Sequence, residues 1–222
     1  MGFNSEGGMP VVFDLETAAI PDADKYMEAP SAPSNYKSPE AIEKYIAEAT
    51  AKQLDKAALD IDLNRIVAIG YDPYVDALGV RVECCPDEQA ERIALKKFWA
   101  DLGDRPLLGF KCLTFDVPTL LRRSLYLGVD PRPVVMGKYR HPGIIDLMEV
   151  LGFDGLVNYR GLTFYCKRFG LDVPDDATSG ADIARLVAAS DWDGVASHCR
   201  SDVIKTSALA RRIGLLPSLD TI

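Results

Sequence analysis

The sequence lacks the long apolar runs and the leader that would indicate a membrane or secreted protein. No apolar segment approaches the roughly 18 to 20 residues that cross a bilayer. The opening residues, MGFNSEGGMP, contain neither a basic region nor an apolar core for secretion. We therefore expect a cytoplasmic protein with no membrane partner.

Cysteine is also scarce, and its spacing suits neither cross-linking nor zinc. The chain has five cysteines, an odd number, and none forms a CxxC pair. This spacing argues against a disulfide framework and against a structural zinc site, so we expect reduced thiols.

Basic residues are fewer than acidic ones, which gives the chain a net charge of −8. That charge argues superficially against a polyanionic partner. However, residues 105–170 carry a net +5 and the remainder −13. A basic surface beside an acidic pocket is compatible with this distribution, and so is an ordinary solvated surface.

The length of 222 residues, with 48% hydrophobic and 26% charged residues, predicts a single domain over residues 1–222. Residues 10–16 form a short apolar strand in this interpretation. A segment rich in Pro, Ala and Ser follows as a loop. Ser38 and Pro39 then begin a helix that continues to about residue 59. We expect residues 17–63 to form a loop-plus-helix insertion and a candidate lid.

The rest of the chain alternates between strand and helix patterns, which predicts an α/β fold. We expect a mixed central sheet of about five strands, with an antiparallel hairpin and parallel strands, flanked by helices. The predicted hairpin covers residues 65–73 and 77–85, and a short buried strand covers 105–110. The predicted helices are 87–102, one after residue 115 that ends at Gly128, and others near 159–169, 180–189 and 191–213.

Carboxylates occur at unexpected places in these apolar patterns. Asp14 and Glu16 interrupt the first strand, and they share one of its faces because side chains alternate along a strand. Asp202 lies on the apolar stripe of the last helix, where an unpaired carboxylate would be costly. His198 precedes it by four residues, a spacing that also suits an ordinary pair at a helix edge.

A fourth acid, Asp116, precedes Val117 and Pro118, where it suits an N-cap. It also follows a buried strand, a common place for catalytic groups. The four acids, brought together, would repel one another, and several would have to be neutral at pH 7. Two Mg²⁺ or Mn²⁺ ions would remove this conflict, because hard cations favour carboxylate oxygens. Such a pair suits in-line attack on a phosphodiester.

The order of these motifs resembles the DEDD superfamily of 3′–5′ exonucleases, which has a ribonuclease H-like fold. It is most similar to the predicted exonucleases related to the proofreading domain of family B DNA polymerases. The family's DxE motif matches Asp14 and Glu16, and its second motif, ending in FD, matches Phe115 and Asp116. The third motif, Tyr-x-x-x-Asp, matches HCRSD, with His198 in place of tyrosine. The likeness extends over nearly the whole chain.

The resemblance implies hydrolysis at the 3′ end of single-stranded DNA by a mechanism that uses two Mg²⁺ or Mn²⁺ ions. Asp14, Glu16 and Asp202 would hold one ion, and Asp14 would share the second with the phosphate, with Asp116 acting through water. His198 would orient the attacking water or accept its proton. The terminal nucleotide would contact the other candidate residues, which are Leu15, Thr17 and Phe115, while Asp146 would support the site from behind.

The chain departs from the family at Lys111, where the second motif normally begins with asparagine. This lysine would touch a substrate phosphate or compete with a metal ion. His141 has no motif context and is expected to be structural. Basic residues interleaved with tyrosines are candidates for contacts with a nucleic-acid strand. These candidates are Arg122, Arg123, Lys138, Arg140, Arg160, Lys167 and Arg168, with Tyr139, Tyr159 and Tyr165.

Two alternatives stay open at this point. An RNA exonuclease of the ribonuclease D type is the nearest competitor, because nothing in the motifs reads the 2′ hydroxyl. A nucleic-acid-binding or protein-binding module that has lost turnover fits too. The sequence gives no indication of protein partners.

Overall fold

The computed structural model describes residues 8–74, 79–137, 140–174 and 178–218. Within these ranges the chain forms a five-stranded sheet in the order β3-β2-β1-β4-β5. β1 pairs with β2 and β2 with β3 in antiparallel fashion, whereas the pairs β1–β4 and β4–β5 are parallel. The mixed α/β sheet expected from the sequence is therefore confirmed. Its strands are β1 (Val11–Ala19), β2 (Asn64–Asp72), β3 (Arg81–Cys84), β4 (Leu107–Gly109) and β5 (Ile144–Asp146).

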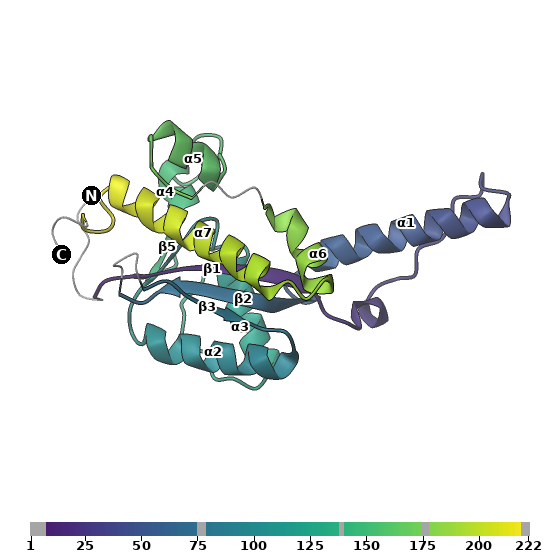
Figure 1. The fold of residues 1–222 in the computed structure, drawn as a ribbon, viewed down its shortest axis with the longest axis horizontal. Helices are drawn as coiled ribbons and strands as arrows, with labels where there is room; N and C mark the ends of the chain where they lie inside the picture. The colour runs from purple at the N-terminus through teal and green to yellow at the C-terminus, as the bar shows by residue number, and fades with distance from the viewer. Residues whose placement is uncertain (1–7, 75–78, 138–139, 175–177, 219–222) are drawn as a thin grey trace.

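Helices cover both faces of the sheet (Figure 1). α2 (Glu88–Leu102) and α3 (Asp116–Tyr126) pack on one face, and α7 (Trp192–Arg212) crosses the other. No helix in the described ranges is long and apolar enough to cross a membrane. The shorter helices are α4 (Leu147–Gly152), α5 (Leu162–Arg168), α6 (Ile183–Ala188) and the single-turn η3 (Gly180–Asp182).

β1 is the central strand and is covered on both faces. Its odd-numbered residues from Val11 to Leu15 belong to the core that packs against α2 and α3. Val12 belongs instead to the core beneath α7. Asp14 and Glu16 have the same parity as Val12, so the alternation of the strand turns both carboxylates toward α7.

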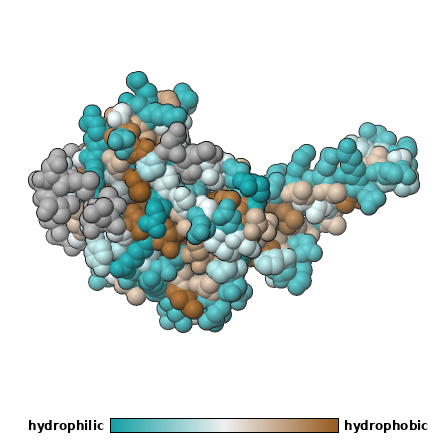
Figure 2. Space-filling model, in the orientation of Figure 1, coloured by the Kyte–Doolittle hydropathy of each residue, from teal (hydrophilic) through white to brown (hydrophobic). Residues whose placement is uncertain are grey.

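A long arm projects from the end of β1 and β2 (Figure 1). It contains η2 (Ala23–Tyr26) and α1 (Pro39–Ala57), whose N-cap Ser38 accepts a hydrogen bond from the backbone of Ala41 at 3.1 Å. Hydrophilic residues line its upper edge (Figure 2). The arm corresponds to the predicted insertion, but β1 continues beyond residue 16 because its last residues, up to Ala19, pair with the start of β2. Its role as a lid stays a prediction.

Several element boundaries differ from the expectations. Asp116 is the first residue of α3 rather than its N-cap, which is Phe115. β5 and α4 occupy a stretch that was assigned no element, where Asp146 caps α4 by accepting from the backbone of Met148. Four helices, α1, α3, α5 and α7, begin or end one to three residues from the predicted positions, and residues 180–189 divide into η3 and α6. β4 is shorter than the predicted strand 105–110. β3 begins at residue 81, and residues 77 and 78 of the predicted strand lie outside the described ranges.

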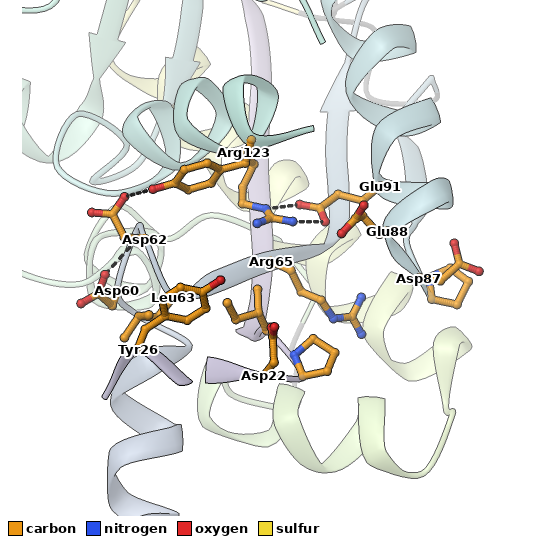
Figure 3. A pocket seen from close by; sticks show the side chains of 14 residues that line it. Asp22, Tyr26, Asp60, Asp62, Leu63, Arg65, Asp87, Glu88, Glu91 and Arg123 are labelled. Atoms are coloured by element: carbon orange, nitrogen blue, oxygen red, sulfur yellow. Dashed lines mark hydrogen bonds and ion pairs between the residues drawn. The ribbon is translucent and has the colours of Figure 1, made fainter. Parts of the chain in front are cut away.

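Arg123 and Glu91 form a buried ion pair between α3 and α2 (Figure 3). The Nε and Nη2 atoms of Arg123 donate to the two carboxylate oxygens of Glu91, each at 2.8 Å. The backbone N–H of Ile66 on β2 donates to the same carboxylate at 2.9 Å. The expectation that Arg123 contacts a nucleic-acid strand is therefore wrong, because its guanidinium is bound inside the protein. Its neighbour Arg122 pairs with Asp62 at the surface.

Arg123→Ala should lower the free energy of unfolding by about 3 to 5 kcal/mol, because it leaves the Glu91 carboxylate buried without its cation. Arg122→Ala is the matched control. It should cost at most about 1 kcal/mol, since its pair with Asp62 is largely solvated. Urea unfolding followed by circular dichroism measures both, and equal losses would contradict the importance of the buried pair.

Candidate active site

Residues from β1, α5, η3 and α7 surround a small acidic cavity on the α7 face of the sheet. Its volume is about 470 Å³. It contains three of the acids predicted from the sequence together with His198. The lining residues are Asp14, Leu15, Glu16, Thr163, Thr178, Ser179, Gly180, His198, Asp202 and Lys205.

A glycine on β2 allows α7 to approach this cavity closely. Gly70 is the register partner of Asp14. A Cβ at Gly70 would lie 2.7 Å from Cys199 Sγ and 3.0 Å from Val203 Cγ2, so a larger residue would push α7 away from the sheet. Cys199 Sγ also donates a weak hydrogen bond to the backbone oxygen of Asp14 at 3.7 Å. The acids of β1 and the polar residues of α7 therefore meet across a tight contact.

The polar residues of α7 have charged partners in the cavity. His198 Nε2 lies 3.7 Å from Glu16 Oε1, and both side chains are buried. Lys205 Nζ donates to Asp202 Oδ1 at 2.8 Å. Lys205 was not among the residues predicted from the sequence. Its spacing of three residues from Asp202, which puts both on one side of a helix, is the signal that would have found it.

Burial and mutual repulsion raise the pKa of Asp14 well above its usual value. Burial is the largest cause, followed by the charges of Glu16, Asp116 and Asp202. The pKa of Asp116 rises to about 7, chiefly through burial, although backbone N–H groups, including that of Leu15, oppose the rise. The fold thus brings Asp116, at the start of α3, within electrostatic reach of Asp14.

A further buried carboxylate, Asp146, fixes the turn that precedes Asp116. It accepts hydrogen bonds from the backbone N–H groups of Lys111 at 2.8 Å, Leu113 at 3.0 Å and Met148 at 2.9 Å. Lys111 has a φ of 62°, a left-handed conformation that asparagine tolerates better than lysine. Burial raises the pKa of Asp146, and the same N–H groups oppose that rise. Asp146 therefore holds the turn that leads to Asp116, and its support of the site stays a prediction.

The residues expected to contact a nucleotide are only partly available for that role. Thr17 Oγ1 donates to the backbone oxygen of Ala58 at 2.7 Å and so ties the base of the arm to β1. Leu15 lines the cavity, but its side chain lies in the core and its N–H is hydrogen-bonded to a carboxylate. Phe115 is partly exposed and Lys111 is exposed.

The donors of the cavity suit a hard divalent cation. Ligand atoms of Asp14, Glu16 and Cys199 lie within 4.8 Å of one another, and this closest group does not include Asp116 or Asp202. Burial and the neighbouring carboxylates raise the pKa of the Cys199 thiol well above its usual value, so it stays protonated and is a poor ligand. The carboxylates fit Mg²⁺ or Mn²⁺, which would relieve their repulsion.

A larger cavity, of about 820 Å³, opens at the base of the arm (Figure 3). Its charged groups serve the fold. Glu91 is held by Arg123, Asp87 caps α2, and Asp62 accepts a hydrogen bond from the Tyr126 hydroxyl. This cavity is the larger one, but a metal site requires several carboxylates in one place, and Asp14, Glu16 and Asp202 line the smaller cavity together.

The stability of the metal-free protein should fall as the pH rises from about 4 to 7. Asp116 binds its proton more tightly in the folded state, with a pKa of about 7 against an ordinary 3.8. Its contribution is therefore complete below the lower value and lost as the pH passes the higher one. Asp116→Asn should flatten this dependence and raise the free energy of unfolding in EDTA at pH 8, by on the order of 2 to 4 kcal/mol. Urea unfolding between pH 4 and 8 tests this, and an Asn variant less stable than wild type at pH 8 would contradict it.

Asp146→Asn should destabilise the protein by about 1 to 3 kcal/mol. The amide can keep the hydrogen bonds on one side, but its NH₂ group would face the N–H of Leu113 or those of Lys111 and Met148. The exposed Asp130, changed to Asn, is the matched control and should be close to neutral. Thermal unfolding compares the two, and similar melting temperatures would show that the turn does not need the carboxylate.

Comparison with known proteins places the chain in a family. Residues 57–217 match the model of a family described as predicted 3′–5′ exonuclease related to the exonuclease domain of PolB. The match contains Asp116, His198 and Asp202, and it begins after Asp14 and Glu16.

The chain is also similar to the uncharacterized protein MJ0365 of Methanocaldococcus jannaschii. The two are 30% identical over 170 residues, which cover 68% of this chain and 90% of that protein. The mixed five-stranded sheet flanked by helices agrees with the ribonuclease H-like fold expected from the motifs. Since the family match covers most of the chain, the protein belongs to the family of predicted 3′–5′ exonucleases related to the exonuclease domain of PolB.

Proposed function

We propose that the protein is a metal-dependent exonuclease that removes nucleotides from the 3′ end of single-stranded DNA. The observation that carries this proposal is one cavity in which Asp14 and Glu16 of β1 face His198 and Asp202 of α7. Membership in a family of predicted 3′–5′ exonucleases supports it. The reaction is hydrolysis of the last phosphodiester bond.

The carboxylates would hold two Mg²⁺ or Mn²⁺ ions. Asp14, Glu16 and Asp202 would bind one, and Asp14 would share the other with the substrate phosphate, with Asp116 acting through water. Such ions, when bound, supply positive charge to the attacking and leaving oxygens of an in-line displacement. The contribution of the chain would be to bring carboxylates of β1 and α7 into one cavity, with Asp116 of α3 near Asp14, and the close contact at Gly70 supports this arrangement.

His198 would orient the attacking water or accept its proton. Imidazole exchanges protons near neutral pH, which suits a general base. The Glu16 carboxylate, with Oε1 at 3.7 Å from His198 Nε2, would stabilise the imidazolium that forms. As the water oxygen forms its bond to phosphorus, a proton would move from the water to His198. The bond from phosphorus to the leaving 3′ oxygen would break, and that oxygen would take up a proton from solvent.

The strand would reach the cavity along α5. Thr163 of α5 lines the cavity. Next to it, the guanidinium of Arg160 lies 5.5 Å from the ring centroid of Phe164, which is exposed. A cation over an exposed ring offers both a backbone contact and a stacking surface to single-stranded DNA. Arg140, Lys167 and Arg168 are exposed and remain candidates, whereas Lys138 and Tyr139 lie outside the described residues.

A nucleic-acid-binding module without turnover is the second candidate. The ion pair between Lys205 and Asp202 favours it, because a lysine there neutralises a carboxylate that a metal would need. Such a protein would bind strands and leave them intact.

A single-stranded DNA labelled at its 5′ end should shorten progressively with Mg²⁺ or Mn²⁺ and stay intact in EDTA. Asp14→Ala should lower the rate at least about a hundred-fold, because it removes the carboxylate that both ions would share. Asp130→Ala, an exposed acid away from the cavity, is the control and should keep the wild-type rate.

The same assay separates the alternatives. Faster shortening of a matched RNA strand would assign the RNA exonuclease, and binding of DNA without shortening would assign the binding module. Internal fragments in place of a 3′ ladder would identify an endonuclease and overturn the proposal.

A further inference from the structure

A buried lysine completes the acidic cavity, and the three exonuclease motifs do not account for it. Lys205 lies one turn after Asp202 on α7, and its side chain is only 7% exposed. Its Nζ donates to Asp202 Oδ1 at 2.8 Å, and it lines the cavity together with Asp14 and Glu16. A buried ammonium group is costly unless an anion compensates it, and here the carboxylates of the cavity do so.

The charge of Lys205 acts on more than its direct partner. Asp14 and Glu16 line the same cavity as Lys205, so the ammonium group faces two further carboxylates besides that of Asp202. The ammonium group therefore acts in the same direction as a bound cation would. The ammonium group of Lys205 would also repel an incoming divalent ion, because the ammonium group and the ion would both bind the carboxylate of Asp202.

We propose that Lys205 is a positioning residue whose ammonium group supplies the positive charge in this cavity when no metal ion is bound. It holds Asp202 in place before metal arrives, and it weakens the binding of the divalent ion that follows. This inference rests on the proposed function, because it takes Asp14, Glu16 and Asp202 as the ligands of that ion. A neutral side chain of similar length should give a cavity that is less stable when empty and binds metal more tightly.

A role in packing alone makes a different prediction. Lys205 also lines a second cavity together with Thr163 and Cys166 of α5. Methionine has a similar unbranched stem, so Lys205→Met keeps most of this packing and removes the charge. If only the stem mattered, the variant would bind metal as the wild type does.

The test compares wild type, Lys205→Met and Lys205→Arg by calorimetric titration with MnCl₂ and by thermal unfolding in EDTA. Lys205→Met should melt at a lower temperature in EDTA and bind Mn²⁺ about ten-fold to a hundred-fold more tightly, from the loss of a unit charge near the ion. Mn²⁺ should then raise its melting temperature more than that of wild type. Lys205→Arg, which keeps the charge, should bind Mn²⁺ like wild type. Lys96→Met, on the exposed side of α2, is the matched control and should change neither quantity.

Unchanged or weaker Mn²⁺ binding by Lys205→Met would overturn the inference. A Lys205→Met protein that folds only when Mn²⁺ is present would support it, whereas one that stays unfolded with and without Mn²⁺ would count against it. The oligonucleotide assay distinguishes the two proposals. A wild-type protein that binds Mn²⁺ but leaves DNA intact defeats the exonuclease alone, and active wild type with unaltered Mn²⁺ binding by Lys205→Met defeats this inference alone.

Discussion

Repulsion among carboxylates in a sheltered cavity is the constraint on which the arrangement of this protein depends. The sheet, α3 and α7 bring Glu16, Asp116 and Asp202 within electrostatic reach of Asp14, and burial favours the neutral forms of Asp14 and Asp116. Each of three acids has a nearby partner that offsets this repulsion. The Lys205 ammonium contacts Asp202, the His198 imidazole lies beside Glu16, and backbone N–H groups donate to Asp116. These interactions weaken quickly with distance in a solvated protein, so they depend on accurate placement of the backbone.

Two residues that take no part in the proposed reaction, Gly70 and Asp146, provide much of that placement. Gly70 lets α7 lie so close to β2 that no side chain would fit between them. Asp146 binds the backbone on both sides of itself and so joins the turn before α3 to the start of α4. Both act through the main chain. Gly70 has no side chain to mark it in the sequence, whereas Asp146 was expected to support the site only through the resemblance to the exonuclease family.

Local patterns were sufficient to find the acids, because they depend only on nearby spacing. Alternation along a strand put Asp14 and Glu16 on one face, and the four-residue spacing on a helix put His198 beside Asp202. The partners of these groups depend on contacts between distant segments, which spacing does not encode. Arg122 and Arg123 are adjacent in the sequence, yet one is solvated and the other buried, since consecutive helical residues point about 100° apart. Lys205 was missed although its three-residue spacing from Asp202 is local, because a lysine at that spacing is ordinary on a helix and only the fold shows that its side chain is buried.

The arm leaves and rejoins the sheet at neighbouring points, because Ala19 at the end of β1 is the register partner of Asn64 at the start of β2. In topological terms everything between them is the loop of a β-hairpin. The entropic cost of closing a loop grows only slowly with its length, so the excursion can be long or short without altering the register of the strands that carry the carboxylates. The length of the arm and the geometry of the sheet are thus independent of each other, and the hydrogen bond from the Thr17 hydroxyl to the Ala58 carbonyl lies where the two parts join.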